Sequence, residues 1–186
     1  MGLPQHVSEM SVQDYLDWEM EQQEKHEFFH GEVFAMAGAS RRHVTVSGNV
    51  FSSLDQALEG GNCRVYMADM KLQAAPDSVY FYPDLFVTCD AADHLEDYAM
   101  NSPIVVVEVL SASTAAYDRG EKFAVYRKIP SLQEFVLIDP ERKTIELFRR
   151  TPSDLWELHD IIPEQPLYLN SIKVEIGWAR IFRNLE

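Results

Sequence analysis

Residues 104–110 read Ile-Val-Val-Val-Glu-Val-Leu, and Glu108 carries the one polar side chain in this segment. A run this apolar is typical of a strand that is buried on both faces. An unpaired carboxylate in such a strand costs on the order of several kcal/mol. We therefore expect Glu108 to be neutralised, paired with a cationic side chain or bound to a metal ion.

Two other features place compatible chemistry near Glu108. Asp84 follows Pro83 at the start of a second strand-like segment, and Lys122 lies in a helix-like segment after Glu108. A divalent ion such as Mg²⁺ (or Mn²⁺) takes oxygen ligands from one or two carboxylates and activates water for phosphodiester hydrolysis. A lysine can orient or deprotonate that water, or stabilise the negative charge that develops. Without a metal, Asp84 could accept turn hydrogen bonds and Glu108 could pair with an arginine.

These residues belong to an ordered set that resembles a known family, the Uma group of restriction endonucleases, within the PD-(D/E)xK phosphodiesterase superfamily. The similarity extends over roughly residues 11–139. Its motifs are Gly31-Glu32, Met36-Ala37-Gly38, His43, Tyr82-Pro83-Asp84, Glu108-Val109-Leu110-Ser111, Ser113-Thr114, Asp118-Arg119, Lys122 and Tyr126.

The resemblance implies an α/β fold: a restriction-endonuclease-like PD-(D/E)xK core with a mixed central β-sheet flanked by helices. We expect a single domain over 1–186, with the core at roughly 11–139 and a C-terminal antiparallel extension at roughly 143–176. Asp84 and Glu108 would bind the metal, with the backbone carbonyl of Val109 as a further ligand. Family members also carry a histidine at the start of the long helix. His43 could contact the phosphate or assist proton transfer, although capping its helix or packing beside Arg42 would also explain it.

The sequence departs from the superfamily at Leu110, which occupies the usual position of the lysine, two residues after the glutamate. In the Uma group, as here, a lysine in the next helix replaces it, and Lys122 takes that role. Asp118 lies one helical turn before Lys122, so the two could instead form a surface pair worth ~0.3–0.5 kcal/mol.

Several other polar residues have simpler interpretations. Glu27 and Glu32 flank a predicted hairpin and could add a carboxylate to the site, although hairpin glutamates are usually solvated. Asp69 and Lys71 share a predicted strand face, which could line the cleft or carry a cross-strand salt bridge. Ser111, Ser113 and Thr114 are expected to cap the following helix, because no histidine lies near them in sequence.

The composition predicts a globular chain without a membrane segment. The 186 residues are 46% hydrophobic and 11% aromatic. No segment approaches the ~18 consecutive apolar residues of a membrane span, and residues 1–6 lack the features of a secretory signal. We expect a cytoplasmic protein in which Cys63 and Cys89 are buried thiols.

The formal net charge of −14 opposes binding to nucleic acid. Local positive patches would be needed, and the sequence offers Arg41-Arg42-His43 at the start of one predicted helix and four basic residues in another. The latter are Arg119, Lys122, Arg127 and Lys128. DNA is thus expected to bind weakly and with a strong dependence on salt, unless these basic residues are merely solvated.

Periodicity and turn residues predict the order of elements. A helix capped by Ser11 precedes a hairpin at His30-Gly31. A helix at about 42–58 carries an apolar stripe of Val46, Val50, Leu54, Ala57 and Leu58 and ends at Gly60-Gly61. Strands are expected at 63–73, 79–89 and 104–110, a helix at 114–129 up to Pro130, strands at 133–139, 143–150, 155–161 and 167–176, and a short helix from Gly177.

Together these features predict a metal-dependent endonuclease that hydrolyses phosphodiester bonds in DNA. A homodimer would bring two sites to the two strands of a duplex. Two alternatives remain. The acidity and Leu110 favour a non-catalytic binding or accessory module that retains the nuclease fold, and the sparse basic surface favours a hydrolase of small phosphodiesters.

Overall fold

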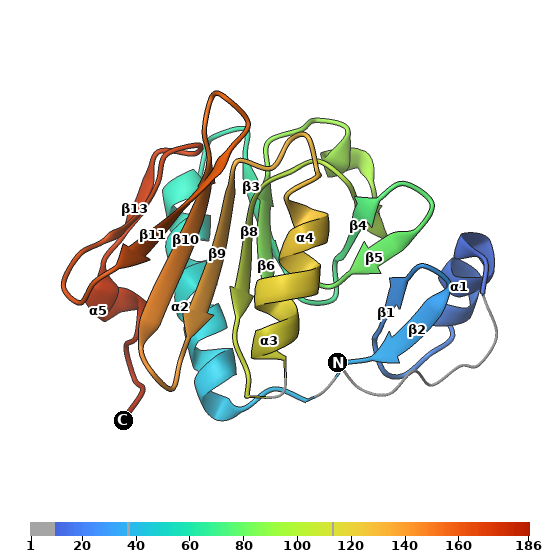
Figure 1. Cartoon of the computed structure of the whole chain (residues 1–186), viewed down its shortest axis with the longest axis horizontal. Helices are drawn as coiled ribbons and strands as arrows, with labels where there is room; N and C mark the ends of the chain where they lie inside the picture. The colour runs from blue at the N-terminus through green and yellow to red at the C-terminus, as the bar shows by residue number, and fades with distance from the viewer. Residues whose placement is uncertain (1–9, 37, 113) are drawn as a thin grey trace.

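The computed structural model describes residues 10–36, 38–112 and 114–186. A six-stranded sheet forms its centre (Figure 1). The strands follow the order β11 (Trp156–Ile161), β10 (Thr144–Arg150), β9 (Glu134–Asp139), β8 (Pro103–Val109), β6 (Leu85–Thr88) and β3 (Arg64–Met67). Neighbouring β8 and β9 run parallel, and the other pairs are antiparallel.

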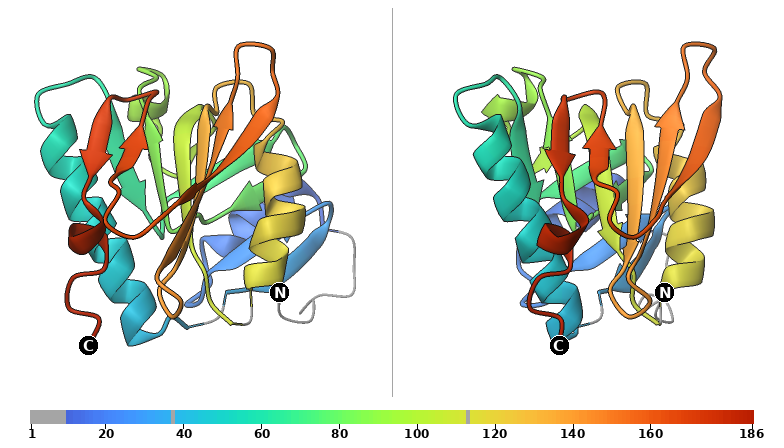
Figure 2. Two further views of the ribbon diagram at one scale, coloured as in Figure 1. Left: turned by 60° about the vertical axis from the view of Figure 1, so that its left-hand side comes forward. Right: turned by 90° about the vertical axis from the view of Figure 1, so that its left-hand side faces the viewer.

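Helical segments cover both faces of this sheet, as the side view in Figure 2 shows. Helix α2 (Arg41–Leu58) covers one face, together with the β12 (Leu167–Leu169) and β13 (Val174–Ile176) hairpin and α5 (Trp178–Ile181). The other face holds α3 (Ala115–Tyr117) and α4 (Phe123–Tyr126). In β8, Val105, Val107 and Val109 face α2, whereas Val106 and Leu110 pack toward α4. The two-residue period of a strand therefore places Glu108 on the α4 side.

Helix α2 confirms the apolar stripe predicted for it, with one exception. Val46, Val50 and Leu54 are fully buried, whereas Ala57 is exposed. The Ser40 hydroxyl accepts the backbone N–H of His43 at 3.2 Å, which caps the helix. This cap fixes His43 in the first turn of the helix, at the edge of the sheet where β8 ends.

A second sheet contains the N-terminal hairpin. Its order is β2 (Glu32–Ala35), β1 (His26–Phe29), β5 (Val79–Phe81), β4 (Lys71–Ala75) and β7 (Ala99–Met100), with β4 and β7 parallel. The predicted tight turn is present, because His30 and Gly31 both have positive φ, 50° and 95°. Helix α1 (Val12–Glu19) is capped by Ser11 as predicted and packs on the hairpin through the buried Tyr15.

The predicted mixed central sheet flanked by helices is present, but a second mixed sheet accompanies it, and the chain crosses between the two sheets five times along the order β2, β3, β4, β5, β6, β7 and β8. The segment predicted as one strand at 63–73 is β3 in one sheet and β4 in the other, joined by a turn in which Asp69 has φ 96°. The segment at 79–89 is likewise divided into β5 and β6 by Tyr82-Pro83-Asp84. Local pattern did not reveal either break, because β5 and β6 are buried at every residue and only strand pairing shows which sheet each half joins.

The C-terminal region confirms the antiparallel extension only in part. Strands β9, β10 and β11 form an antiparallel meander. Residues 167–176, predicted as one strand, instead form the separate β12–β13 hairpin. The turn at Lys173, with φ 55°, reverses the chain between them.

The helix predicted at 114–129 is present but irregular. Between α3 and α4 the chain forms a π turn, Asp118–Lys122. Such turns are rare and often occur at functional sites. Both end residues of this turn, Asp118 and Lys122, are buried.

The prediction of two buried thiols is wrong. Cys63 and Cys89 are half-buried and joined by a disulfide. The register of the β3–β6 pair explains the contact, because Arg64 lies opposite Thr88 and the next residue outward on each strand is a cysteine. Within the described ranges, none of the helices combines the length and apolar character required to cross a bilayer.

Candidate active site

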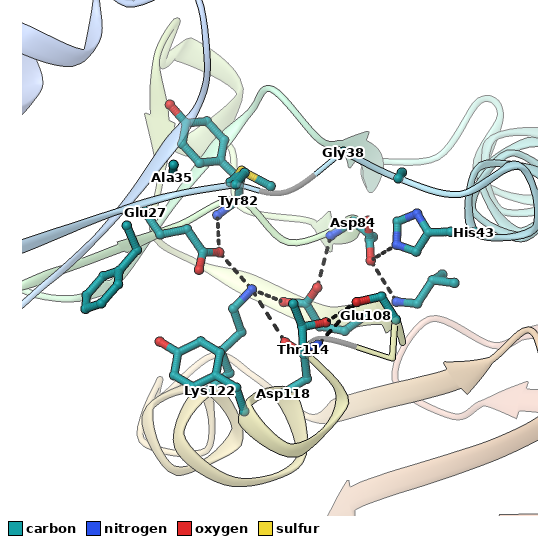
Figure 3. A pocket seen from close by; sticks show the side chains of 16 residues that line it. Glu27, Ala35, Gly38, His43, Tyr82, Asp84, Glu108, Thr114, Asp118 and Lys122 are labelled. Atoms are coloured by element: carbon teal, nitrogen blue, oxygen red, sulfur yellow. Dashed lines mark hydrogen bonds and ion pairs between the residues drawn. The ribbon is translucent and has the colours of Figure 1, made fainter. Parts of the chain in front are cut away.

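A pocket of about 270 Å³ lies where the two sheets separate, beside the π turn. Figure 3 shows the side chains that line it. Four carboxylates from four different places in the fold line it: Glu27 from β1, Asp84 before β6, Glu108 from β8 and Asp118 from the π turn. Glu27, Glu108 and Asp118 lie within ion-pair distance of the Lys122 ammonium.

The Glu108 carboxylate forms hydrogen bonds through both oxygens. Oε1 accepts from Lys122 Nζ at 3.2 Å and from the Tyr126 hydroxyl at 2.9 Å, and Oε2 accepts the Asp84 backbone N–H at 3.4 Å. The residue is 4% exposed. Burial raises the pKa of Glu108 to about 8; Lys122 lowers this pKa, while the neighbouring carboxylates raise it further. The pocket therefore holds more negative charge than one lysine neutralises.

Asp84 belongs to the segment Tyr82–Asp84, which separates β5 from β6, and its side chain contacts the end of β8. Its Oδ2 accepts the backbone N–H of Val109 at 2.7 Å and lies 3.0 Å from His43 Nε2. Asp84 and Glu108 thus line the same pocket from adjacent antiparallel strands, as Figure 3 shows.

His43 lies between Asp84 and the first turn of α2. Burial lowers the pKa of His43, but the hydrogen bond and the charge of Asp84 outweigh this effect, so the pKa is raised. Its other ring nitrogen, Nδ1, is buried without a hydrogen-bond partner among the described residues. The side chain thus has one nitrogen held by Asp84 and one that is not engaged.

Lys122 lies deep in the pocket, at 6% exposure. Its Nζ is 2.7 Å from Glu27 Oε1, 3.2 Å from Glu108 Oε1 and 3.8 Å from Asp118 Oδ1. Burial alone would lower the pKa of Lys122, but the charges of Glu108, Glu27 and Asp118 hold this pKa well above its ordinary value. The ammonium is therefore charged, and it reaches Glu108 from the next helical segment, as the displaced-lysine interpretation requires.

Two pocket residues differ from their simpler interpretations. Glu27 is 8% exposed and paired with Lys122, so its prediction as a solvated hairpin glutamate is wrong, whereas Glu32 is exposed as expected. The pairing of Asp118 with Lys122 exists, but at 3% exposure Asp118 is not on the surface. Glu27 lies beside the apolar Phe28 and Phe29, and this sequence signal could have indicated that its strand is buried. In the structure this strand, β1, lies between β2 and β5 in the sheet.

Asp69 and Lys71, which the sequence also singled out, do not line this pocket, whereas Ser111 and Thr114 do. Asp69 is exposed in its turn, and Lys71 is buried in β4, so the two share no strand face. The Ser111 hydroxyl accepts the Thr114 backbone N–H at 3.2 Å, which supports the capping interpretation. Ser113 lies outside the described residues, as do Ala37 and residues 1–9.

The basic residues near the pocket are largely engaged in ion pairs. Arg119 binds Glu146 with a shortest distance of 2.7 Å, and Arg42 lies 3.6 Å from Glu141. Arg127 and Lys128 are exposed at the end of the helical segment. The positive surface available to a phosphate backbone is thus small.

The donor set suits a hard divalent cation that retains water ligands. Across the described residues, no three His, Cys, Asp or Glu side chains are arranged to hold a metal by themselves. Asp84 and Glu108 supply two carboxylates, and Val109 adds a backbone carbonyl at the pocket wall. Mg²⁺ typically binds one or two carboxylates and completes its octahedron with water or substrate oxygens. Burial and the neighbouring carboxylates raise the pKa of Glu108, and a bound cation would lower this pKa again.

The fold has a counterpart among solved structures. The structure is similar to the crystal structure of a putative nuclease belonging to DUF820 from Anabaena variabilis ATCC 29413, with a TM-score of 0.78 over 95% of this chain and 99% of that chain. The two sequences are 16% identical, so the similarity establishes the fold.

The family follows from sequence similarity. Residues 12–178 match the Uma2 family, described as "Putative restriction endonuclease", and the chain belongs to it. Two uncharacterized proteins of Synechocystis sp. (strain ATCC 27184 / PCC 6803 / Kazusa) are also similar. One is 36% identical over 95% of this chain and 93% of its own, and the other is 32% identical over 83% and 89%.

Proposed function

We propose that this protein is a Mg²⁺- or Mn²⁺-dependent endonuclease that hydrolyses phosphodiester bonds in DNA. The observation that carries the proposal is the convergence of Asp84, Glu108 and Lys122, from three separate elements, on one pocket. A structural ion pair needs one carboxylate for one lysine. Here burial, together with three neighbouring carboxylates, raises the pKa of Glu108 despite Lys122, and a bound cation would favour the charged form of Glu108.

Each residue has a distinct proposed role. Asp84 and Glu108 hold the ion, with the Val109 carbonyl as a further ligand. When bound, such an ion supplies charge neutralisation at the phosphate and lowers the pKa of a water ligand. The Lys122 ammonium orients the attacking water and stabilises negative charge on the phosphate oxygens. His43, whose pKa is raised, presents a proton to the phosphate or to the leaving oxygen.

The dimensions of the pocket suit a single phosphodiester group. Sites that enclose whole small ligands have volumes of ~300–1,000 Å³, and this pocket has about 270 Å³. Such a pocket suits one phosphodiester group of a chain that passes across its opening. The net charge of −14 favours the second candidate, a hydrolase of small phosphodiesters, because that substrate needs no basic surface.

Cleavage assays test the proposal directly. The protein is incubated with end-labelled duplex and single-stranded DNA, and separately with bis(p-nitrophenyl) phosphate, in Mg²⁺, Mn²⁺ or chelator. We expect ion-dependent cleavage within the DNA, lost in Asp84→Asn and Glu108→Gln and retained in Glu32→Gln. Hydrolysis of the small diester alone would establish the second candidate. Failure to hydrolyse any of these substrates, by a protein that still binds Mn²⁺, would favour the accessory module.

A further inference from the structure

We infer that Glu27 is a positioning residue that holds the Lys122 ammonium in place when Glu108 is engaged by a metal ion. The inference rests on the proposed function and adds the N-terminal hairpin to the active site. Glu27 lies on β1, in the five-stranded sheet, whereas Glu108 lies on β8, in the six-stranded sheet. The side chains of both glutamates contact the Lys122 ammonium (Figure 3).

The distances rank Glu27 first among the partners of Lys122. Glu27 Oε1 lies 2.7 Å from Nζ, compared with 3.2 Å for Glu108 and 3.8 Å for Asp118. A charge-assisted hydrogen bond of ~2.7–2.9 Å is in the strong range, and a separation of 3.8 Å is too long for a hydrogen bond. Glu27 is therefore the partner best placed to fix the ammonium.

Glu27 is itself held in place. Its Oε1 also accepts the backbone N–H of Tyr82 at 3.3 Å, directly before Pro83 and Asp84. Strand β1 pairs on one side with β2 and on the other with β5, so the backbone of Glu27 is anchored within the sheet. The Glu27 carboxylate thus contacts both the Lys122 ammonium and the segment that carries Asp84.

The displaced lysine explains why such an anchor is needed. A lysine at position 110 would project from the strand that carries Glu108. Lys122 instead extends a flexible side chain from the π turn of another element. If Glu108 donates its oxygens to an ion, Lys122 loses one of its two hydrogen-bonding carboxylates, and Glu27 remains. A misplacement of about 1 Å in a catalytic group can cost ~10²-fold in rate.

The hairpin provides a matched control. Glu32 lies on the facing strand of the same hairpin, has the same side chain and is exposed. Glu27→Gln removes the charge that holds Lys122 and keeps the shape of the side chain, whereas Glu32→Gln removes a charge of equal size from the solvated strand. Glu27→Asp retains the charge and shortens its reach.

Kinetics form the first part of the test. In Glu27→Gln we expect kcat for DNA cleavage to fall by ~10–10²-fold, with KM and the Mn²⁺ dissociation constant within about twofold of the parent. Glu27→Asp should be intermediate and Glu32→Gln unchanged. If Glu27 were only structural, Glu27→Gln would lower the melting temperature and the folded fraction, but it would not lower kcat while KM stayed constant. A folded Glu27→Gln or Glu27→Asp variant with parental kcat would overturn the inference.

A crystal structure of the parent soaked in Mn²⁺ forms the second part and needs no activity. We expect Lys122 Nζ to remain within hydrogen-bonding distance of Glu27 while Glu108 contacts the ion. An ammonium that leaves Glu27 in that structure would overturn the inference. A parent protein that hydrolyses no phosphodiester would contradict the proposed function, and the soaked crystal would still decide the position of Lys122.

Discussion

Glu108 and Glu134 lie on the adjacent parallel strands β8 and β9, and both are buried, yet their surroundings differ. Glu134 is 0% exposed and has a complete set of donors. It accepts from Arg149 Nε at 3.0 Å, from the Asn170 and Ser171 backbone N–H groups at 3.0 Å each, and from the Ser171 hydroxyl at 2.6 Å. Glu108 shares its one lysine with Glu27 and Asp118.

The difference shows that burial of a carboxylate does not by itself indicate a function. Glu134 ties the β12–β13 hairpin to the main sheet, and its donors satisfy its charge. Glu108 lines a pocket where carboxylates outnumber cations, and burial raises its pKa to about 8. The excess negative charge around a buried carboxylate, together with access from a pocket, distinguishes a candidate site from a structural ion pair.

The largest expected effect comes from Glu108→Gln. Cleavage of DNA should fall by at least ~10³-fold, because a ligand to the ion and its charge are both removed. Mn²⁺ binding, measured by titration calorimetry, should be lost, while the folded state should remain at least as stable as the parent. If the variant binds Mn²⁺ normally, Glu108 is not a ligand and the contrast with Glu134 disappears.

The reciprocal substitution, Glu134→Gln, should affect stability and leave the site intact. Removing one partner of a buried, hydrogen-bonded ion pair costs ~3–5 kcal/mol. Urea denaturation should show a loss of this order, with Mn²⁺ affinity unchanged in the folded protein. Weakened Mn²⁺ binding in folded Glu134→Gln would mean that the two glutamates are coupled.

The cationic partners extend the comparison. Lys122→Ala should lower cleavage by ~10²-fold or more, the usual loss for a positioned electrostatic group, and Mn²⁺ binding should survive because the carboxylates remain. Arg149→Ala, on the Glu134 side, should reduce stability only. Adding Leu110→Lys to Lys122→Ala should restore part of the activity. A folded Lys122→Ala protein that cleaves at the parental rate would exclude the lysine from the mechanism.

The pH dependence separates the two glutamates further. The folded-state pKa of Glu108 is about 8, above its ordinary value of 4.5. Between these pH values the folded protein holds a proton that the unfolded chain lacks, so its stability should fall as pH rises through this window. Below pH 8, Mn²⁺ affinity should increase about tenfold per pH unit, since binding displaces one proton. Glu134→Gln should retain the Mn²⁺ profile; an affinity independent of pH would contradict the assignment of Glu108.

The smallest expected effect concerns the surface. Binding of a labelled duplex should be weak and should fall roughly tenfold or more between 50 and 200 mM salt, because a few phosphate contacts act against the overall acidity. Glu134→Gln should leave this dependence unchanged. Tight binding that ignores salt would mean that DNA is held by other interactions.

Much of the secondary structure could be predicted from local pattern. The 3.6-residue stripe of α2, the His30-Gly31 turn and the apolar runs of β8 and β9 each reflect a single element and its burial. The change of sheet at Ala68–Met70 and at Tyr82–Asp84 could not, because only pairing with distant strands decides which sheet each half of the predicted strand joins. The pairing of Cys63 with Cys89 depends on the β3–β6 register, which local pattern does not contain.

The sequence alone determined that a carboxylate would lie in an apolar strand, that a second would follow Pro83, and that a lysine would lie in the helical segment after Glu108. These conclusions hold because burial and period follow from residue type. Only the tertiary structure decided which charges share one environment. The fold brings Glu27 from one sheet, Glu108 from the other, and Asp118 and Lys122 from the π turn into one pocket. Electrostatic coupling depends on the distance between charges in space rather than on their separation along the chain.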